Sequence, residues 1–150
     1  MKKIIYTIII LSVFASCEID NMPKEVRIDN IYLQEYPQTY GGEVWDVFSL
    51  FAVDFPPDPY IQIHKGTQLI FTSGTFPNAS GEIIKYPVNH SFNPNESYTL
   101  TVYDEDMDGD DTMGEISTFY PYSSAYGTTP DTKIVSGGGI TVELELSYIY

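Results

Sequence analysis

The sequence predicts an all-β protein, an antiparallel β-sandwich of about eight strands, on the basis of three observations. After the first 24 residues, no stretch of ten or more residues shows the apolar period of a helix. Short alternating or β-branched segments recur instead, separated by Gly, Pro, Asn and Asp. The final segment, ITVELELSYIY, alternates apolar and polar residues as a half-exposed antiparallel strand does.

The N-terminal segment is typical of a targeting signal and is excluded from the fold. Residues 1–3 are short and basic, and residues 4–14 are almost wholly apolar. This run is well short of the roughly 20 residues that span a bilayer. It ends in FASC at residues 14–17, which resembles the lipobox of bacterial lipoproteins. The resemblance implies that residues 1–16 are removed, that Cys17 is acylated and anchors the chain to a membrane, and that residues 17–24 form a tether.

The alternative is an ordinary secretory peptide with an incidental cysteine. Cys17 is the only cysteine, so disulfides contribute nothing to stability. Glu18 and Asp20 resemble the acidic surface-export signals of Bacteroidetes lipoproteins. We therefore expect a lipid-anchored protein of the bacterial cell envelope, at the outer membrane, with the membrane face left open.

The chain is strongly acidic, with a formal charge of −14. Without Lys2 and Lys3, five basic residues remain against 21 acidic ones, a formal charge of −16. Nucleic acid is excluded as a partner because phosphate binding needs a basic surface. An anionic membrane would also repel this chain, except through a bridging metal ion.

Eight segments of the predicted domain, residues 25–150, have strand character. Turn residues separate them, and this spacing favours a sandwich. The 13 tyrosines fit such a fold, since each combines a large apolar ring with a hydroxyl that reaches water. The predicted strands are residues 26–34, 59–64, 68–72, 82–88, 98–103, 113–119, 132–135 and 140–148.

An acidic stretch dominates the second half of the chain. Six carboxylates fall within eight consecutive positions without a Lys or Arg: Asp104, Glu105, Asp106, Asp108, Asp110 and Asp111. Two unit charges roughly 4 Å apart repel by about 4 kcal/mol at an effective dielectric of about 20. A compact loop of this composition therefore needs a cation, and Ca²⁺ suits it because Ca²⁺ accepts many oxygens in flexible geometry. The alternative is an acidic turn that is simply solvated.

Two kinds of calcium loop fit this stretch. The helix-loop-helix pattern D-x-[DN]-x-[DN]-G-x5-E is met by Asp104, Asp106, Asp108, Gly109 and Glu115. Both flanks, SYTLTVY and EISTFYPY, look like strands, however, and Asp111 stands where that loop is normally apolar. We therefore favour a strand-loop-strand site at the tip of a sandwich.

The strand-loop-strand interpretation rests on a resemblance to the third calcium loop of the C2 domain family. Val102, Asp104, Asp106 and Asp111, followed by TMGE, match the pattern of a V-x-D-x-D strand end, a later Asp and Gly-Glu. The resemblance implies a C2-like sandwich that binds Ca²⁺ through these aspartates. The loop is one residue shorter than in typical members, which leaves Asp108 and Asp110 as optional ligands.

A second acidic turn resembles the first calcium loop of the same family. There, S-D-P-Y is followed by an alternating strand, and Asp58-Pro59-Tyr60 followed by IQI matches that core. Pro at the first strand position sacrifices no important ladder hydrogen bond. The family also places an Asp earlier in this loop, and both Asp46 and Asp54 remain candidates for it.

The apolar stretch VFSLFAV, residues 47–53, lies between those two candidates as an apparent insertion. It is either a buried strand or sheet edge, or an apolar loop that inserts into a bilayer or a partner beside the metal.

Catalytic motifs are missing from the sequence. His64 and His90 are the only histidines, no G-x-S-x-G elbow occurs, and the Gly137–Gly139 run lies between predicted strands rather than before a helix. We therefore expect no enzyme activity. Two function classes remain. One is a calcium-binding module that bridges to an anionic lipid, glycan or protein, and the other is a metal-independent structural or assembly subunit of an envelope complex.

Overall fold

The computed structural model describes residues 22–39, 41–42, 45–48, 53–106, 109–122 and 129–150. The signal segment 1–16, Cys17 and Asp108 lie outside these described residues. The described residues form strands and no helix: β1 Glu25–Glu35, β2 Asp46–Phe48, β3 Val53–Phe55, β4 Pro59–Lys65, β5 Gln68–Thr72, β6 Ile84–Phe92, β7 Tyr98–Asp104, β8 Asp111–Phe119, β9 Thr132–Gly137 and β10 Ile140–Ile149.

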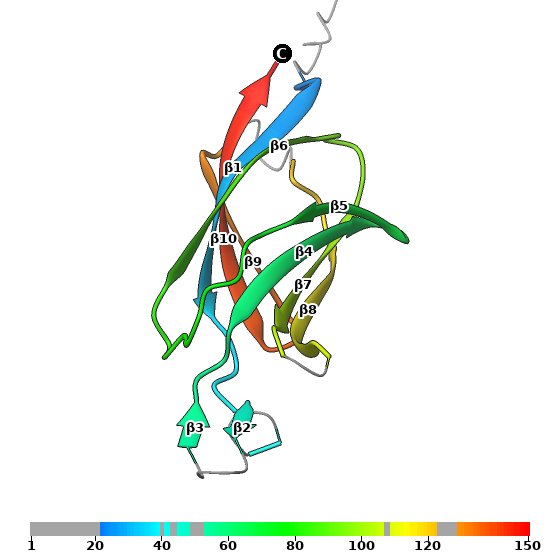
Figure 1. Cartoon of the computed structure of the whole chain (residues 1–150). Coiled ribbons are helices and arrows are strands. Elements are labelled where there is room, and N and C mark those ends of the chain that lie inside the picture. Colours follow the sequence, from blue (N-terminus) through cyan, green and yellow to red (C-terminus); the bar gives the residue numbers. More distant parts are fainter. Residues whose placement is uncertain (1–21, 40, 43–44, 49–52, 107–108, 123–128) are drawn as a thin grey trace, which may run out of the picture.

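Eight of the strands pair into two antiparallel sheets that face each other (Figure 1). The first sheet has the order β6-β1-β10-β9 and the second the order β5-β4-β7-β8. The predicted all-β sandwich of eight antiparallel strands is therefore confirmed. Within the described part of the chain, no helix is long and apolar enough to cross a membrane.

Two features differ from the sequence prediction. First, β2 and β3 form a separate small hairpin within the insertion, with Val47 paired to Asp54. Second, β6 extends through Pro87 and Asn89 to Phe92, whereas the prediction ended this strand at residue 88. The extension is possible because β6 is an edge strand, where Pro is tolerated. In addition, a register shift in its pairing with β1 accommodates Asn89, whose φ is 48°.

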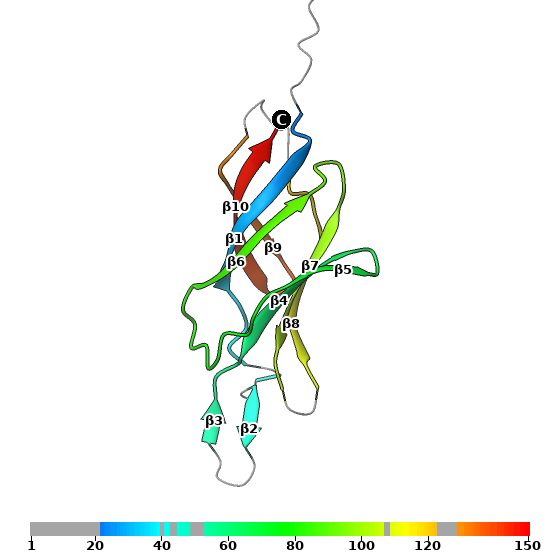
Figure 2. The ribbon, with the colours of Figure 1, turned by 45° about the horizontal axis from the view of Figure 1, so that its top comes forward.

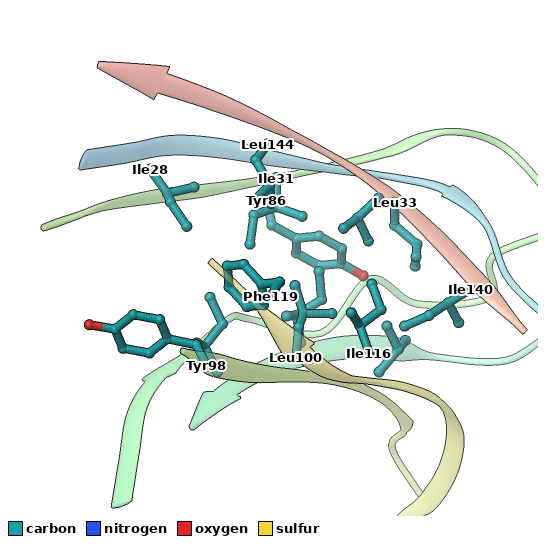
Figure 3. Packing of buried hydrophobic residues seen from close by; sticks show 14 of the residues in the cluster. Ile28, Ile31, Leu33, Tyr86, Tyr98, Leu100, Ile116, Phe119, Ile140 and Leu144 are labelled. Carbon is teal, nitrogen blue, oxygen red and sulfur yellow. The ribbon is translucent and has the colours of Figure 1, made fainter. Parts of the chain in front are cut away.

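The core lies between the two sheets and consists of alternate residues from their inner faces (Figure 3). β10 behaves as predicted, since its four apolar alternating residues are buried and the polar ones between them are not. Tyr86 on β6 also joins the two layers, because its buried hydroxyl donates to the carbonyl oxygen of Pro59 on β4 at 2.7 Å. The fully buried side chains include Ile28, Ile31, Leu33, Ile61, Ile63, Leu100, Val102 and Leu144.

Both views show the β2–β3 hairpin and the β7–β8 connection at the same end of the sandwich, which we call the tip (Figures 1 and 2). The C-terminus lies at the opposite end. β1 begins at that opposite end too, because Glu25 pairs with Ile149 and the amide of Lys24 donates to the Ile149 carbonyl at 2.7 Å. The chain therefore enters the domain at the end opposite the tip.

Two glycines let the sheets approach each other closely where β8 meets the β9–β10 turn. A Cβ atom on Gly114 would lie 2.5 Å from the carbonyl oxygen of Gly138, and one on Gly138 would lie 2.5 Å from that of Glu115. Real Cβ atoms do not approach that closely, and Gly138 also has a φ of 55°. Only glycine therefore fits at these positions without movement of the backbone.

Candidate metal site at the tip

Three adjacent strands of the second sheet bring the aspartates of the two predicted loops together. Pro59, the first residue of β4, pairs with Asp104, the last residue of β7. Asp104 in turn pairs with Asp111, the first residue of β8. Asp58 immediately precedes Pro59, so Asp58, Asp104 and Asp111 lie at one end of one sheet. The two turns therefore meet at this end of the sheet.

The acidic stretch lies in a strand-loop-strand context. β7 ends at Asp104 and β8 begins at Asp111, so strands flank the stretch on both sides. The helix-loop-helix alternative is therefore wrong, although its residue pattern is complete. The flanking β-branched and aromatic residues decided the local structure, because they pair with neighbouring strands.

Asp104 differs from the other aspartates at this end of the sheet in its burial. Its side chain is wholly buried, and one carboxylate oxygen, Oδ1, accepts a hydrogen bond from the backbone N–H of Asp58 at 2.6 Å. The other oxygen, Oδ2, is buried and receives no hydrogen bond from the described residues. A buried polar atom without a partner costs roughly 1–3 kcal/mol, and more when it is charged. Asp104 therefore has an oxygen that a ligand could satisfy.

The surroundings disfavour a charge on Asp104. Burial raises the pKa of its carboxyl to about 6, and the hydrogen bond from Asp58 opposes the rise only in part. The value of about 6 includes smaller upward contributions from the negative charges on Asp106, Asp58 and Asp111. All the charged groups of the described residues that act on Asp104 in this way are thus carboxylates, and a cation at this position would reverse the penalty.

Asp58 holds the first loop against two other segments. Its carbonyl oxygen accepts the N–H of Glu105 at 3.2 Å, which ties this loop to the acidic stretch. Its carboxylate accepts the backbone N–H of Asn78, in the segment that leads from β5 to β6. That segment also donates to β4 from Phe76 and to the residues just before β4 from Ala79. Sequence reasoning missed the contribution of Asn78, although Pro77-Asn78 is a turn signal.

Asp110 has a different environment from the other aspartates. Its carboxylate accepts a hydrogen bond from the hydroxyl of Tyr60 at 2.6 Å. The ring of Tyr60 is stacked on that of Tyr103, with centroids 5.3 Å apart and an interplanar angle of 20°. Sequence reasoning did not identify Tyr60 as part of this site.

The first-loop candidates Asp46 and Asp54 lie on the two strands of the β2–β3 hairpin. Asp46 pairs with Phe55, and Asp54 pairs with Val47. The choice between Asp46 and Asp54 as the first-loop ligand stays a prediction.

The carboxylates converge on Asp104 without forming a closed cage. Among the described residues, no group of three or more His, Cys, Asp or Glu side chains has the spacing to hold a metal ion. Asp106 is half-buried and Asp111 is exposed. A cation bound here would have to draw these carboxylates inward.

A second acidic region lies on the outer face of the first sheet, in an open cleft of about 480 Å³. Glu145 accepts hydrogen bonds from Asn30 Nδ2 at 2.7 Å and from the hydroxyl of Tyr32 at 3.1 Å. Glu143 accepts one from Gln34 Nε2 at 2.7 Å. These carboxylates are half-buried, and each has a neutral donor on β1.

Comparisons with known proteins give similarity to solved structures alone. No protein-family model matches the chain, and no curated protein matches its sequence. One similar structure is that of the two C2 domains of extended-synaptotagmin 2, calcium bound, with a TM-score of 0.49, 22% identity and coverage of 83% of this chain and 46% of that chain. This chain thus spans about half the length of that fragment.

Two further similar structures have lower scores. A structure described as a C2 domain has a TM-score of 0.46 and 17% identity, covering 82% of this chain and 97% of that one. Human GIVD cytosolic phospholipase A2, in complex with methyl gamma-linolenyl fluorophosphonate inhibitor and terbium chloride, has a TM-score of 0.46 and 15% identity, covering 85% and 18%. These TM-scores are all below 0.5.

Proposed function

We propose that this chain is a calcium-binding β-sandwich module of a lipid-anchored envelope protein. The observation that carries the proposal is Asp104, a wholly buried carboxylate with one unsatisfied oxygen beside three other carboxylates. Asp58, Asp104, Asp106 and Asp111 would hold the ion. When bound, Ca²⁺ would supply positive charge to these oxygens and draw the two loops together.

The donor set supports Ca²⁺ over a softer metal. The side chains around Asp104 are carboxylates, which are hard oxygen donors. His90 is on β6 in the other sheet, where its ring packs against Phe92, and His64 pairs with Thr99 at the end of β4 away from the tip. Mg²⁺ demands a near-ideal octahedron, which carboxylates on two separate loops are poorly placed to provide.

The position of the tip supports a role in contacting a partner. In the proposed arrangement, Cys17 is acylated and the tether leads into β1, which begins at the end opposite the tip. The calcium ion would then face away from the anchoring membrane. An anionic lipid of another membrane, an acidic glycan or a protein could complete its coordination, and no chemistry on a substrate is proposed.

One observation favours a second candidate, a metal-independent structural or assembly subunit of an envelope complex. The described carboxylates do not form a ready-made cage of three. In that case the acidic loop would be a solvated surface. The carboxyl of Asp104 would then be either protonated or charged at a cost in stability.

The decisive experiment is a thermal unfolding comparison of the purified chain in excess chelator, in millimolar Ca²⁺ and in millimolar Mg²⁺. At ten times the dissociation constant, Ca²⁺ adds about 1.4 kcal/mol to the free energy of unfolding. For a domain of this size we expect a rise in Tm of about 5 °C, and a smaller rise with Mg²⁺. No rise with Ca²⁺ would leave the structural subunit as the better function.

Two variants assign the effect to the tip. Asp104→Asn should abolish the Ca²⁺-dependent rise, because the buried charge that attracts the ion is lost. Glu145→Gln on the outer sheet face is the matched control and should keep the full rise. Loss of the rise in both variants would point to a general charge effect rather than to a site.

The anchor and the partner need separate tests. Cells fed labelled palmitate should label the wild-type protein and not Cys17→Ser. Sedimentation with phosphatidylserine vesicles and with neutral vesicles, each with and without Ca²⁺, then tests a lipid partner. Calcium binding without sedimentation would leave a glycan or a protein as the partner.

A further inference from the structure

The hydrogen bond between Tyr60 and Asp110 lies beside the tip aspartates but on the opposite side of the sheet from the core. Tyr60 alternates with buried residues of β4, and it pairs in register with Tyr103 of β7. The 2.6 Å distance between the Tyr60 hydroxyl and Asp110 Oδ2 is typical of an O–H donor on a charged oxygen. The phenol is thus a fixed partner for one carboxylate of the acidic stretch.

The Tyr60 hydroxyl donates to Asp110, and its ring is stacked on that of Tyr103. The stacked ring of Tyr103 limits the movement of Tyr60 on the sheet surface. Asp110 is therefore held by a hydroxyl donor on a stacked ring.

Asp110 and Asp111, although neighbours in the chain, have partners on different sides of the sheet. Asp111 pairs in register with Asp104, whose side chain is buried. Asp110 is hydrogen-bonded to Tyr60, which alternates with the buried residues of β4.

We propose that Tyr60 is a positioning residue for the calcium site, which keeps Asp110 out of the ligand set and fixes the chain next to Asp111, the residue that pairs with Asp104. This inference rests on the proposed calcium function. It also assigns Asp110, one of the sequence candidates for a ligand, to the restraint of the loop. Because this hydrogen bond restrains Asp110 before the ion arrives, less conformational entropy is lost on binding.

The test uses Ca²⁺ dissociation constants of the purified full chain, measured by isothermal titration calorimetry. Tyr60→Phe and Asp110→Ala should each weaken binding about fivefold, the lower end of typical coupling between sites. The double variant should be no weaker than either single variant, since both remove one hydrogen bond. Asp110→Asn keeps an acceptor for the phenol and should stay within about twofold of the wild type at physiological ionic strength, where distant charges are screened.

Asp111→Asn removes the charge of a proposed ligand, so it shows how much binding weakens when a ligand is lost. It should weaken Ca²⁺ binding at least about tenfold. If Asp110→Asn weakens binding as much as Asp111→Asn, Asp110 is a ligand and the inference is wrong. If Tyr60→Phe binds Ca²⁺ as tightly as the wild type, Tyr60 has no positioning role and the inference is equally wrong. A purely structural role for the hydrogen bond would change the free energy of unfolding but leave the Ca²⁺ dissociation constant unchanged.

A second measurement separates failure of this inference from failure of the proposed function. Unfolding free energies of Tyr60→Phe, Asp110→Ala and their double variant in chelator report whether Tyr60 and Asp110 are coupled in the metal-free protein. A wild type that binds no Ca²⁺ overturns the calcium function and the positioning role with it, even where this coupling is present. Normal wild-type binding with additive effects on the Ca²⁺ dissociation constant overturns the positioning role alone.

Discussion

The tip and the outer face of the first sheet are both acidic, but their carboxylates are in different physical states. On the sheet face, Glu143 and Glu145 are half-buried and accept hydrogen bonds from neutral side chains of β1. At the tip, Asp104 is wholly buried with one unsatisfied oxygen, and the charges around it are negative.

The difference shows that a high density of carboxylates is not what marks a metal site. A half-exposed carboxylate with a hydrogen-bond donor is already stable, so it gains little from a cation. A buried carboxylate among other carboxylates is destabilised until a cation or a proton arrives. Of the four predictions that follow, ordered from the largest expected effect to the smallest, the last three test this contrast.

The largest effect on stability should come from forcing the two sheets apart near the tip. Gly138→Ala places a Cβ against the backbone of Glu115 and strains a residue with positive φ, and it should lower the free energy of unfolding by about 3 kcal/mol. Urea denaturation measures this change. Gly137→Ala is the matched control, because its Cβ would make only ordinary contacts at 3.5 Å. Equal losses in both variants would show that the close approach at Gly138 is not special.

The next largest effect should be a gain in stability. In chelator at pH 7, Asp104→Asn removes the buried charge and should raise the free energy of unfolding by about 2 kcal/mol. The amide can still accept the N–H of Asp58, and its own N–H groups can donate to neighbouring carboxylates. Denaturant titration of both proteins in chelator measures the gain. A loss of stability would mean that the charge on Asp104 is compensated in the metal-free protein.

The stability gained by Asp104→Asn should increase as pH rises. The folded pKa of Asp104, about 6, is above its unfolded value of 3.8, so the folded state binds more protons between these values. The contribution of Asp104 to stability therefore falls as pH rises from about 4 to about 6. The stability difference between Asp104→Asn and the wild type should be near zero at pH 4 and complete above pH 7. A difference that is constant with pH would assign the effect to packing.

The smallest effect should come from the sheet face. Glu143→Gln and Glu145→Gln each keep an acceptor for the donors on β1, and each should change the free energy of unfolding by less than about 0.5 kcal/mol in chelator. Chemical denaturation at physiological ionic strength measures both. A gain comparable with that of Asp104→Asn would remove the contrast between the two acidic regions.

Local patterns predicted much of the fold. The alternation in β10 and the Asp58-Pro59-Tyr60 entrance to β4 predicted strands where the structure has them, because alternation reports one buried face directly. The extent of β6 could not be predicted in the same way. Pro87 and Asn89 indicate a break, and only the edge position of β6 permits the strand to continue.

The sequence by itself determined an acidic, all-β chain with two aspartate-rich turns, because composition and period are local properties. The tertiary structure alone decided which carboxylates differ from the others. Pairing among β4, β7 and β8 buries Asp104, while Tyr60 holds Asp110 on the opposite side of the sheet. Burial and hydrogen-bond partners arise from residues far apart in the chain, so identical residues in one short stretch acquire different chemistry.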